Sequence, residues 1–246
     1  MRKIFASNNR RLRLVSFDND SIVLNLSEDN DENIPFPNIQ ELKINLDSIQ
    51  ILPRLFTLLP NPQRLHACVE KSSHEEDRSK LFANLSPLIY LTDFQLRFVD
   101  FAEMFDTIAS ILNQMPFLET FTFDLWTNDE RLVNGTTSLT QSIRLRLPWL
   151  KKLEVQAVAE PGFWAAPNLE YLIVEHNSIK HLLEDEPTCS LLQKQIVRLE
   201  IFRVETIDTE QLKRIGLVFN KIIEFILNIK NSKTFIDSII TTALLL

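Results

Sequence analysis

Short runs of apolar residues recur along the chain with one spacing. LPWLKKLEV at 147–155, MPFLETFTF at 115–123 and APNLEYLIV at 166–174 each place apolar residues at positions i, i+3 and i+5, shortly after a proline. Positions i+3 and i+5 differ by two residues, the period of a β-strand, so their side chains point to the same face. Each run therefore predicts a strand that follows a turn in which proline fixes φ.

Eight such runs follow one another. Helical periodicity lies between several of them, clearly over 100–115 and 207–222 and more loosely over 48–59 and 136–147. A strand and helix repeated in this way cannot bury an apolar face alone, so neighbouring units must stack. The central apolar residues of the runs lie about 26 residues apart on average: Leu42, Leu65, Phe94, Phe121, Leu153, Leu172, Leu199 and Phe225.

The pattern predicts an α/β solenoid, a horseshoe of about eight irregular repeats with parallel strands on the concave face and helices on the convex face. A doubly wound α/β fold is the alternative, because it also alternates strands and helices. That fold usually relies on a glycine-rich turn, and this chain has only three glycines. We expect a single domain over 1–246, with a strand-like N-terminal cap at 1–33, repeats at 34–230 and a C-terminal capping helix at 231–246.

The runs NPQRLHA, PNIQELKI and APNLEYLIV resemble leucine-rich repeats of the ribonuclease-inhibitor-like type, in particular those of F-box/leucine-rich-repeat proteins. The resemblance extends from about residue 34 to residue 230. It implies a leucine-rich-repeat module that binds a protein, in that family as the substrate-recognition part of a ubiquitin ligase. We find no F-box pattern before the repeats, where SIVLNL at 21–26 is strand-like, so nothing about docking to the ligase adaptor carries over.

Composition narrows the classes of partner. The net charge is −7, which argues against nucleic acid as the main partner because phosphate backbones require clustered Lys and Arg. No run approaches the ~18 consecutive apolar residues of a membrane span, so we expect no membrane partner. Cys68 and Cys189 lie far apart and suggest free thiols in a reducing compartment, the cytoplasm or the nucleus.

Two groups of residues offer candidate chemistry. His176 and His181 precede Glu184, Asp185 and Glu186, but the five-residue separation of the histidines does not place them on one helical face, and we interpret the group as a solvated loop rather than a metal site. His66 and Cys68 lie on one face of a strand, yet no third group that would activate the thiol is apparent. The sequence therefore predicts a protein that is not an enzyme and has no cofactor and no metal.

The residues at i+2, i+4 and i+6 of each run are predicted to face the concave side. Aromatic and Arg side chains concentrate there in the C-terminal half, and such residues dominate binding hot spots. Trp126 lies in a long insertion that lengthens one repeat, and such insertions often bind; packing of Trp126 against the solenoid edge is the alternative. The predicted protein-binding residues are Lys152, Glu154, Tyr171, Ile173, Arg198, Glu200, Phe202 and Trp126.

Several alternatives stay open at this point. Burial of Phe202 and Ile173 under a neighbouring loop is as good an interpretation as a role in binding. A small-molecule enzyme of the α/β type, with paired acids or histidines at strand C-termini, is a different functional class. A degenerate repeat protein without a retained partner is the third.

Overall fold

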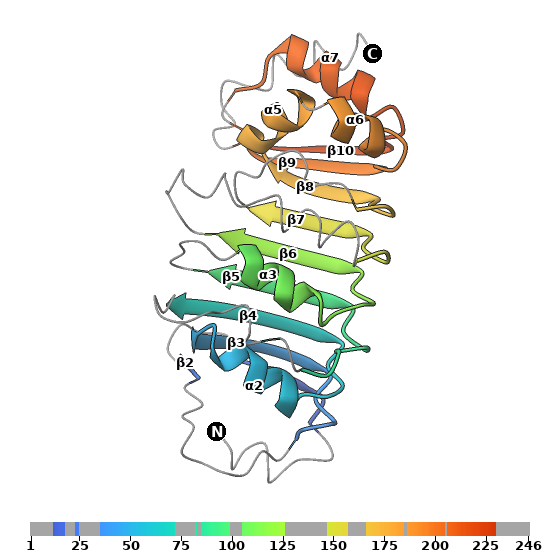
Figure 1. Cartoon of the computed structure of the whole chain (residues 1–246). Coiled ribbons are helices and arrows are strands. Elements are labelled where there is room, and N and C mark those ends of the chain that lie inside the picture. Colours follow the sequence, from blue (N-terminus) through green and yellow to red (C-terminus); the bar gives the residue numbers. More distant parts are fainter. Residues whose placement is uncertain are drawn as a thin grey trace.

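The structure is a computed structural model that describes residues 12–17, 23–24, 35–71, 82, 85–98, 105–125, 147–156, 166–184, 186–204 and 206–229. In this part of the chain, ten strands form one sheet in which every pairing is parallel. From β3 onward each strand lies beside the strand that follows it in the sequence (Figure 1). The expected α/β class with sequential parallel strands is confirmed.

The strands carry the predicted apolar runs. The eight central residues, from Leu42 to Phe225, all lie in β3–β10 and are aligned with one another across the sheet. Two further strands, β1 and β2, pair with β3 and lie in the region expected to be an N-terminal cap. The strands are β1 (Leu14–Ser16), β2 (Val23–Leu24), β3 (Glu41–Ser48), β4 (Arg64–Lys71), β5 (Asp93–Phe98), β6 (Thr120–Leu125), β7 (Lys152–Gln156), β8 (Tyr171–Glu175), β9 (Arg198–Val204) and β10 (Glu224–Ile229).

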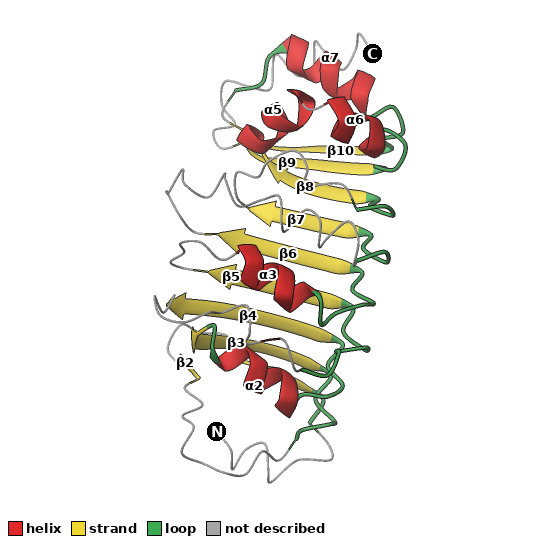
Figure 2. Cartoon of the chain, in the orientation of Figure 1, coloured by secondary structure: helices red, strands yellow, loops and turns green. Residues whose placement is uncertain are grey.

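The helices in the described ranges are α2 (Ile51–Leu58), α3 (Phe105–Leu112), α5 (His176–Glu184), α6 (Glu186–Leu192) and α7 (Thr209–Val218). Figure 2 shows α2 and α3 crossing the same face of the sheet. The helices predicted at 48–59, 100–115 and 207–222 are therefore present as α2, α3 and α7. Apart from Leu147, the predicted helix at 136–147 lies outside the described residues, as does the predicted capping helix at 231–246.

Helix α7 begins with a capping box. The Asp208 carboxylate accepts from the Gln211 backbone N–H at 2.7 Å, and the Gln211 side chain accepts from the Asp208 N–H at 3.3 Å. Both bonds satisfy donors that a helix N-terminus otherwise leaves without partners. Farther along, the Arg214 guanidinium donates to the Leu183 carbonyl of α5 at 3.0 Å, and this bond ties α7 to the preceding repeat.

The prediction of a solvated loop after strand 171–174 is wrong. Residues His176–Glu184 and Glu186–Leu192 form α5 and α6. The buried side chains of Ile179, Leu182 and Leu183 recur at helical spacing, so their burial against the sheet stabilises a helix in spite of the polar residues between them. The buried Cys189 thiol of α6 then donates to the Leu182 carbonyl at 3.0 Å.

The recurring proline lies in the turn that precedes a strand. In Met115–Leu118, Leu147–Leu150 and Ala166–Leu169, the last N–H of a four-residue turn donates to the first carbonyl, and proline is the second residue. Proline favours this position because its fixed φ matches the turn. After the turn, two successive N–H groups donate to one carbonyl of the preceding repeat, as Lys151 and Lys152 do to Glu119.

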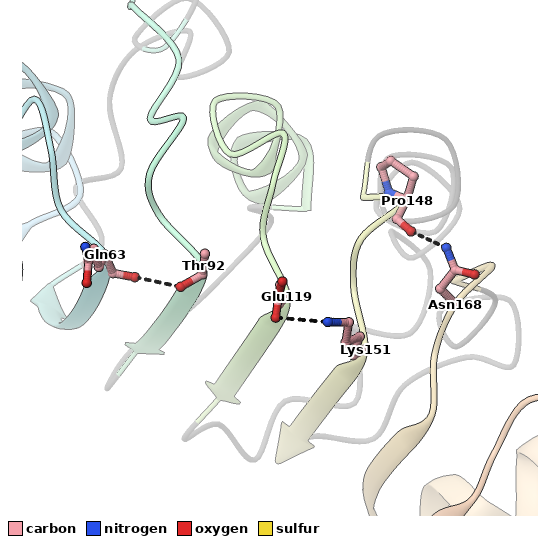
Figure 3. Close-up of polar contacts among 6 residues, drawn as sticks. All are labelled: Gln63, Thr92, Glu119, Pro148, Lys151 and Asn168. Atoms are coloured by element: carbon pink, nitrogen blue, oxygen red, sulfur yellow. Dashed lines mark hydrogen bonds and ion pairs between the residues drawn. The ribbon is translucent and has the colours of Figure 1, made fainter.

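Side-chain bonds join neighbouring turns at this end of the strands, which we call the turn edge. The amides of Asn61, Asn168 and Gln195 each donate to the proline carbonyl of the preceding repeat, at Pro37 (3.3 Å), Pro148 (2.5 Å) and Pro167 (2.7 Å) respectively. Figure 3 shows the Asn168–Pro148 bond beside the Lys151–Glu119 ion pair and the Thr92–Gln63 hydrogen bond. We call the three amide-to-carbonyl bonds the amide ladder.

The core lies between the sheet and the helices. Strand residues at i+3 and i+5, such as Phe94, Leu96 and Phe121, are fully buried, and so are helix residues such as Ile108 and Ile111. The rings of Phe94 and Phe121 stack at 5.9 Å between centroids across neighbouring strands. Among the described residues, no helix is long and apolar enough to span a membrane.

Candidate protein-binding face

The strands present a second face that points away from the core. Residues alternate along each strand, as in β3, where Leu42, Ile44 and Leu46 are buried and the residues between them are partly or fully exposed. We call the face formed by these alternate residues of β3–β10 the open face. Lys152, Tyr171 and Arg198 are aligned on it at i+2, and Glu154, Ile173 and Glu200 at i+4.

Tyr171 lies at the centre of a group of contacts on the open face. The Nζ atom of Lys152 lies 5.2 Å from the centroid of the Tyr171 ring, and the guanidinium carbon of Arg198 lies 4.4 Å from it. These cations come from β7 and β9, on either side of β8, and both are attracted by the ring's π electrons. The Tyr171 hydroxyl donates to Oε2 of Glu200 at 2.8 Å.

Glu200 holds a second partner as well. Its Oε1 accepts from the Asn228 amide at 2.6 Å, so the carboxylate bridges β8 and β10. Arg198 also forms an ion pair with Glu224 at 3.0 Å, and Lys152 forms one with Glu154 at 3.6 Å. We call Lys152, Glu154, Tyr171, Arg198, Glu200, Glu224 and Asn228 the Tyr171 cluster.

The contacts and the partial burial of Tyr171 change the pKa of its hydroxyl group. Burial, the largest cause, and the hydrogen bond to Glu200 raise the pKa of Tyr171 from 10.0 to about 12. The phenol therefore stays protonated and donates to Glu200 across the physiological range. The side chains of the cluster therefore contact one another in the absence of a partner.

The other predicted protein-binding residues differ in how much surface they offer to a partner. Ile173 lies on the open face between Glu154 and Glu200 but is only 7% exposed, so it offers a partner little surface. Phe202 is half-buried, and the Arg203 guanidinium lies 5.6 Å from the centroid of its ring. Trp126 lies outside the described residues.

A β-bulge places Phe202 and Arg203 together. The register passes from Leu227↔Ile201 to Ile229↔Val204, so two residues of β9 face one residue of β10. Arg203 has φ 53°, a left-handed conformation that costs a non-glycine residue roughly 1–2 kcal/mol. The bulge leaves Arg203 exposed and returns Val204 to the core, where it is fully buried. An even alternation of side chains does not predict this arrangement.

His66 and Cys68 lie two residues apart in β4, as expected for residues on one face, and Cys68 is not part of a disulfide bond. Burial, the largest cause, lowers the pKa of His66 from 6.5, and the carboxylate of Asp93 opposes this effect. Among the described residues, no group of three or more His, Cys, Asp or Glu side chains is arranged to hold a metal ion. His176 belongs to α5 rather than to the predicted loop.

Sequence reasoning missed a row of exposed aromatic residues at the turn edge. Tyr90, Phe117 and Trp149 occupy the turn position that carries Asn61, Asn168 or Gln195 in other repeats. They are 53%, 46% and 53% exposed, and Ile89 beside them is 48% exposed. We call these four residues the aromatic ridge. The signal was present in the sequence: the residue just before position i changes from an amide to an aromatic ring in three successive repeats.

The chain was also compared with known proteins. It matches none of the protein-family models against which it was compared, and the comparison with curated protein sequences gave no match.

Proposed function

We propose that the chain is a leucine-rich-repeat solenoid that binds a protein partner on its open face and has no catalytic role. The repeated geometry supports the repeat assignment. Strands at intervals of about 26 residues share one register, and each is preceded by a pair of N–H groups that donate to a single carbonyl of the previous repeat. Units that contact only their neighbours are characteristic of solenoids.

The Tyr171 cluster is the observation that carries the binding proposal. Tyr and Arg are the residue types that contribute most to binding hot spots. Here the Tyr171 ring is held between Lys152 and Arg198, and its hydroxyl is fixed by Glu200. Because these side chains are already ordered, a partner that docks on them loses less conformational entropy.

The width of the cluster favours a protein over a small molecule. Its residues come from four adjacent strands, β7–β10, which span about 14 Å at the usual strand spacing. Small ligands are instead enclosed in concave sites that bury most of their surface. The surface of a folded protein carries both apolar and charged groups and is broad enough to contact all four strands.

The resemblance to F-box/leucine-rich-repeat proteins suggests the kind of assembly. In those proteins the repeats recognise the substrate of a ubiquitin ligase, and we propose the same class of role for this chain. This part of the proposal depends on the resemblance alone. It predicts that the protein bound at the open face is a substrate of a ubiquitin ligase, and it implies nothing about how this chain would contact the ligase itself.

The test is affinity purification of the tagged chain followed by mass spectrometry. The test variant combines Lys152→Ala, Tyr171→Ala, Arg198→Ala and Phe202→Ala. The control variant combines Lys43→Ala, Arg64→Ala and Arg97→Ala, which lie on the same face at β3–β5. Circular dichroism tests whether both variants keep the secondary structure of the unmodified chain.

We expect at least one protein that is recovered with the unmodified chain and with the control variant to be lost with the test variant. That protein is then purified and its affinity measured directly against all three forms. If every recovered protein binds the test variant as tightly as it binds the unmodified chain, the assignment of the binding face is wrong.

A further inference from the structure

The Tyr171 cluster contains more carboxylates than cations. Its cations are Lys152 and Arg198, and its carboxylates are Glu154, Glu200 and Glu224. Lys152 forms an ion pair with Glu154 at 3.6 Å. Arg198 forms one with Glu224 at 3.0 Å. Glu200 is the remaining carboxylate, and within the part of the chain that the structure describes it forms no ion pair.

The bonds that Glu200 does make come from uncharged groups. The Tyr171 hydroxyl donates to Oε2 at 2.8 Å, and the Asn228 amide donates to Oε1 at 2.6 Å. An ionised carboxylate can accept about four hydrogen bonds, so each oxygen of Glu200 can still accept from another donor. Because the two donors come from β8 and β10, on either side of β9, they also fix the orientation of the carboxylate.

Isoleucine side chains flank Glu200 along the open face. Ile173 of β8 and Ile226 of β10 are each paired with Glu200 in the strand register, so the three residues form one row. Ile226 is partly exposed, whereas Ile173 is only 7% exposed. A carboxylate between two alkyl groups is complementary to a side chain that has an apolar stem and a positively charged head.

A partner that covers the Tyr171 cluster buries Glu200. Removing an ionised carboxylate from water is costly unless the carboxylate is paired with a cation and hydrogen-bonded. Both cations of the cluster are already paired with other carboxylates. The cation for Glu200 must therefore come from the partner.

We propose that the protein partner places an arginine side chain on Glu200. This inference rests on the proposed function, because it concerns the same open face. The guanidinium donates one hydrogen bond to each oxygen of the carboxylate, an arrangement that its planar fork allows and a lysine ammonium does not. The methylene groups of the arginine lie against Ile226.

The experiment uses the full chain and a phage-displayed library of random peptides. The library is selected for binding to the unmodified chain, and peptides that also bind the open-face variant are discarded. The open-face variant combines Lys152→Ala, Tyr171→Ala, Arg198→Ala and Phe202→Ala. The peptide that binds most tightly is then synthesised with a fluorescein label, and its affinity is measured by fluorescence anisotropy.

Two substitutions test the contact from its two sides. On the chain, Glu200→Gln removes the charge of the carboxylate and keeps the size of the side chain. On the peptide, citrulline replaces arginine and removes the charge of the guanidinium. The matched control is Glu41→Gln, which changes the net charge of the chain equally and lies on the open face at β3, where Glu41 is paired with Arg64.

We expect the selected peptide to contain arginine. Glu200→Gln and the citrulline substitution should each weaken binding at least about tenfold, as is usual when one partner of a charged hydrogen-bonded pair is neutralised. Combined, they should weaken binding no further than either does alone, because they remove the same contact. Glu41→Gln should leave the affinity unchanged.

Three results would overturn the inference. The first is that peptides selected for the open face contain no arginine. The second is that Glu200→Gln leaves the affinity unchanged. The third is that the effects of Glu200→Gln and of citrulline add, because the arginine then contacts another group. In all three cases binding is still lost in the open-face variant, so the proposed function is not contradicted.

A different result bears on both proposals. If no selected peptide depends on the open face, the proposed function and the arginine contact are both contradicted.

Discussion

Arg198 and Tyr171 are held together by the geometry of two neighbouring strands. The guanidinium carbon of Arg198 lies 4.4 Å from the centroid of the Tyr171 ring, because the two residues are paired in the β8–β9 register. Glu200, two residues beyond Arg198, accepts from the Tyr171 hydroxyl. The ring is thus fixed to β9 at its face and at its tip.

The Tyr171–Glu200 hydrogen bond should contribute to stability. We expect Tyr171→Phe to lower the free energy of unfolding by about 1–2 kcal/mol, since the acceptor is charged and the bond is partly buried. The ring and its contacts with Lys152 and Arg198 remain in this variant. Urea unfolding measures the change, and a double-mutant cycle with Glu200→Ala, which removes the acceptor, isolates the bond. Strictly additive effects of the two substitutions would show that the bond contributes nothing.

The raised pKa of Tyr171 should make stability depend on alkaline pH. Because the pKa is 10.0 in the unfolded chain and about 12 in the folded protein, the folded state binds the proton more tightly. The contribution of Tyr171 is therefore complete below pH 10 and is lost as the pH rises from 10 to 12. Unfolding free energies of Tyr90→Phe and of Tyr90→Phe with Tyr171→Phe should converge over this range. Ultraviolet titration of the first variant, in which only Tyr171 remains, measures the pKa directly, and a pKa near 10.0 would contradict the prediction.

The amide ladder should stabilise the turn edge. We expect Asn168→Ala to lower the free energy of unfolding by about 1 kcal/mol, the usual net contribution of one hydrogen bond, because it removes the bond to the Pro148 carbonyl. Gln195→Ala should have a similar effect through Pro167. Glu170→Ala is the control, since Glu170 is an exposed residue of the same turn edge. Equal effects of Asn168→Ala and Glu170→Ala would show that the amide is unimportant.

The strand register was predictable because two local rules coincide. The two-residue period identifies the core-facing positions, and proline marks the turn before β6, β7 and β8. Together they align Phe121, Leu153 and Leu172 without any knowledge of the helices. The capping box of α7 also depends on local sequence, because Asp208 and Gln211 lie three residues apart.

The missed features depend on contacts between repeats. Helices α5 and α6 contain many polar residues, and the burial of Leu182 and Leu192 against neighbouring elements outweighs that local signal. The bulge at Phe202 and Arg203 appears only when β9 is placed beside β10. The low exposure of Ile173 likewise depends on its neighbours across the sheet rather than on its own repeat.

Core packing between repeats should dominate stability. Phe121 is fully buried, and its ring lies 5.9 Å from that of Phe94 and 6.0 Å from that of Phe123. Phe121→Ala should lower the free energy of unfolding by about 3–5 kcal/mol through lost burial and the cavity it leaves. Phe121→Leu should lower the free energy of unfolding by a smaller amount. Ile223→Ala, at an 86% exposed position, should change the free energy of unfolding by less than about 0.5 kcal/mol. Similar losses for Phe121→Ala and Ile223→Ala in urea unfolding would contradict this account of the core.

His66 should make stability depend on mildly acidic pH. In the folded protein, burial lowers the pKa of His66 below its ordinary value of 6.5. The carboxylates of Asp93 and Glu41 raise this pKa, whereas the positive charges of Lys43 and Arg64 lower it further. The unfolded chain therefore binds a proton at a higher pH than the folded chain does. The stabilising contribution is complete above pH 6.5 and is lost as the pH falls toward the folded-state pKa.

Two substitutions test the origin of the His66 shift. His66→Gln should remove this part of the pH dependence of unfolding. Asp93→Asn should lower the pKa of His66 further, because it removes the negative charge that raises this pKa most and leaves Lys43 and Arg64 in place. Proton NMR titration of the imidazole measures both pKa values, with His66→Gln identifying the signal. A rise in the pKa of His66 on Asp93→Asn would contradict this account of the shift, because loss of the carboxylate leaves only charges that lower the pKa or act more weakly.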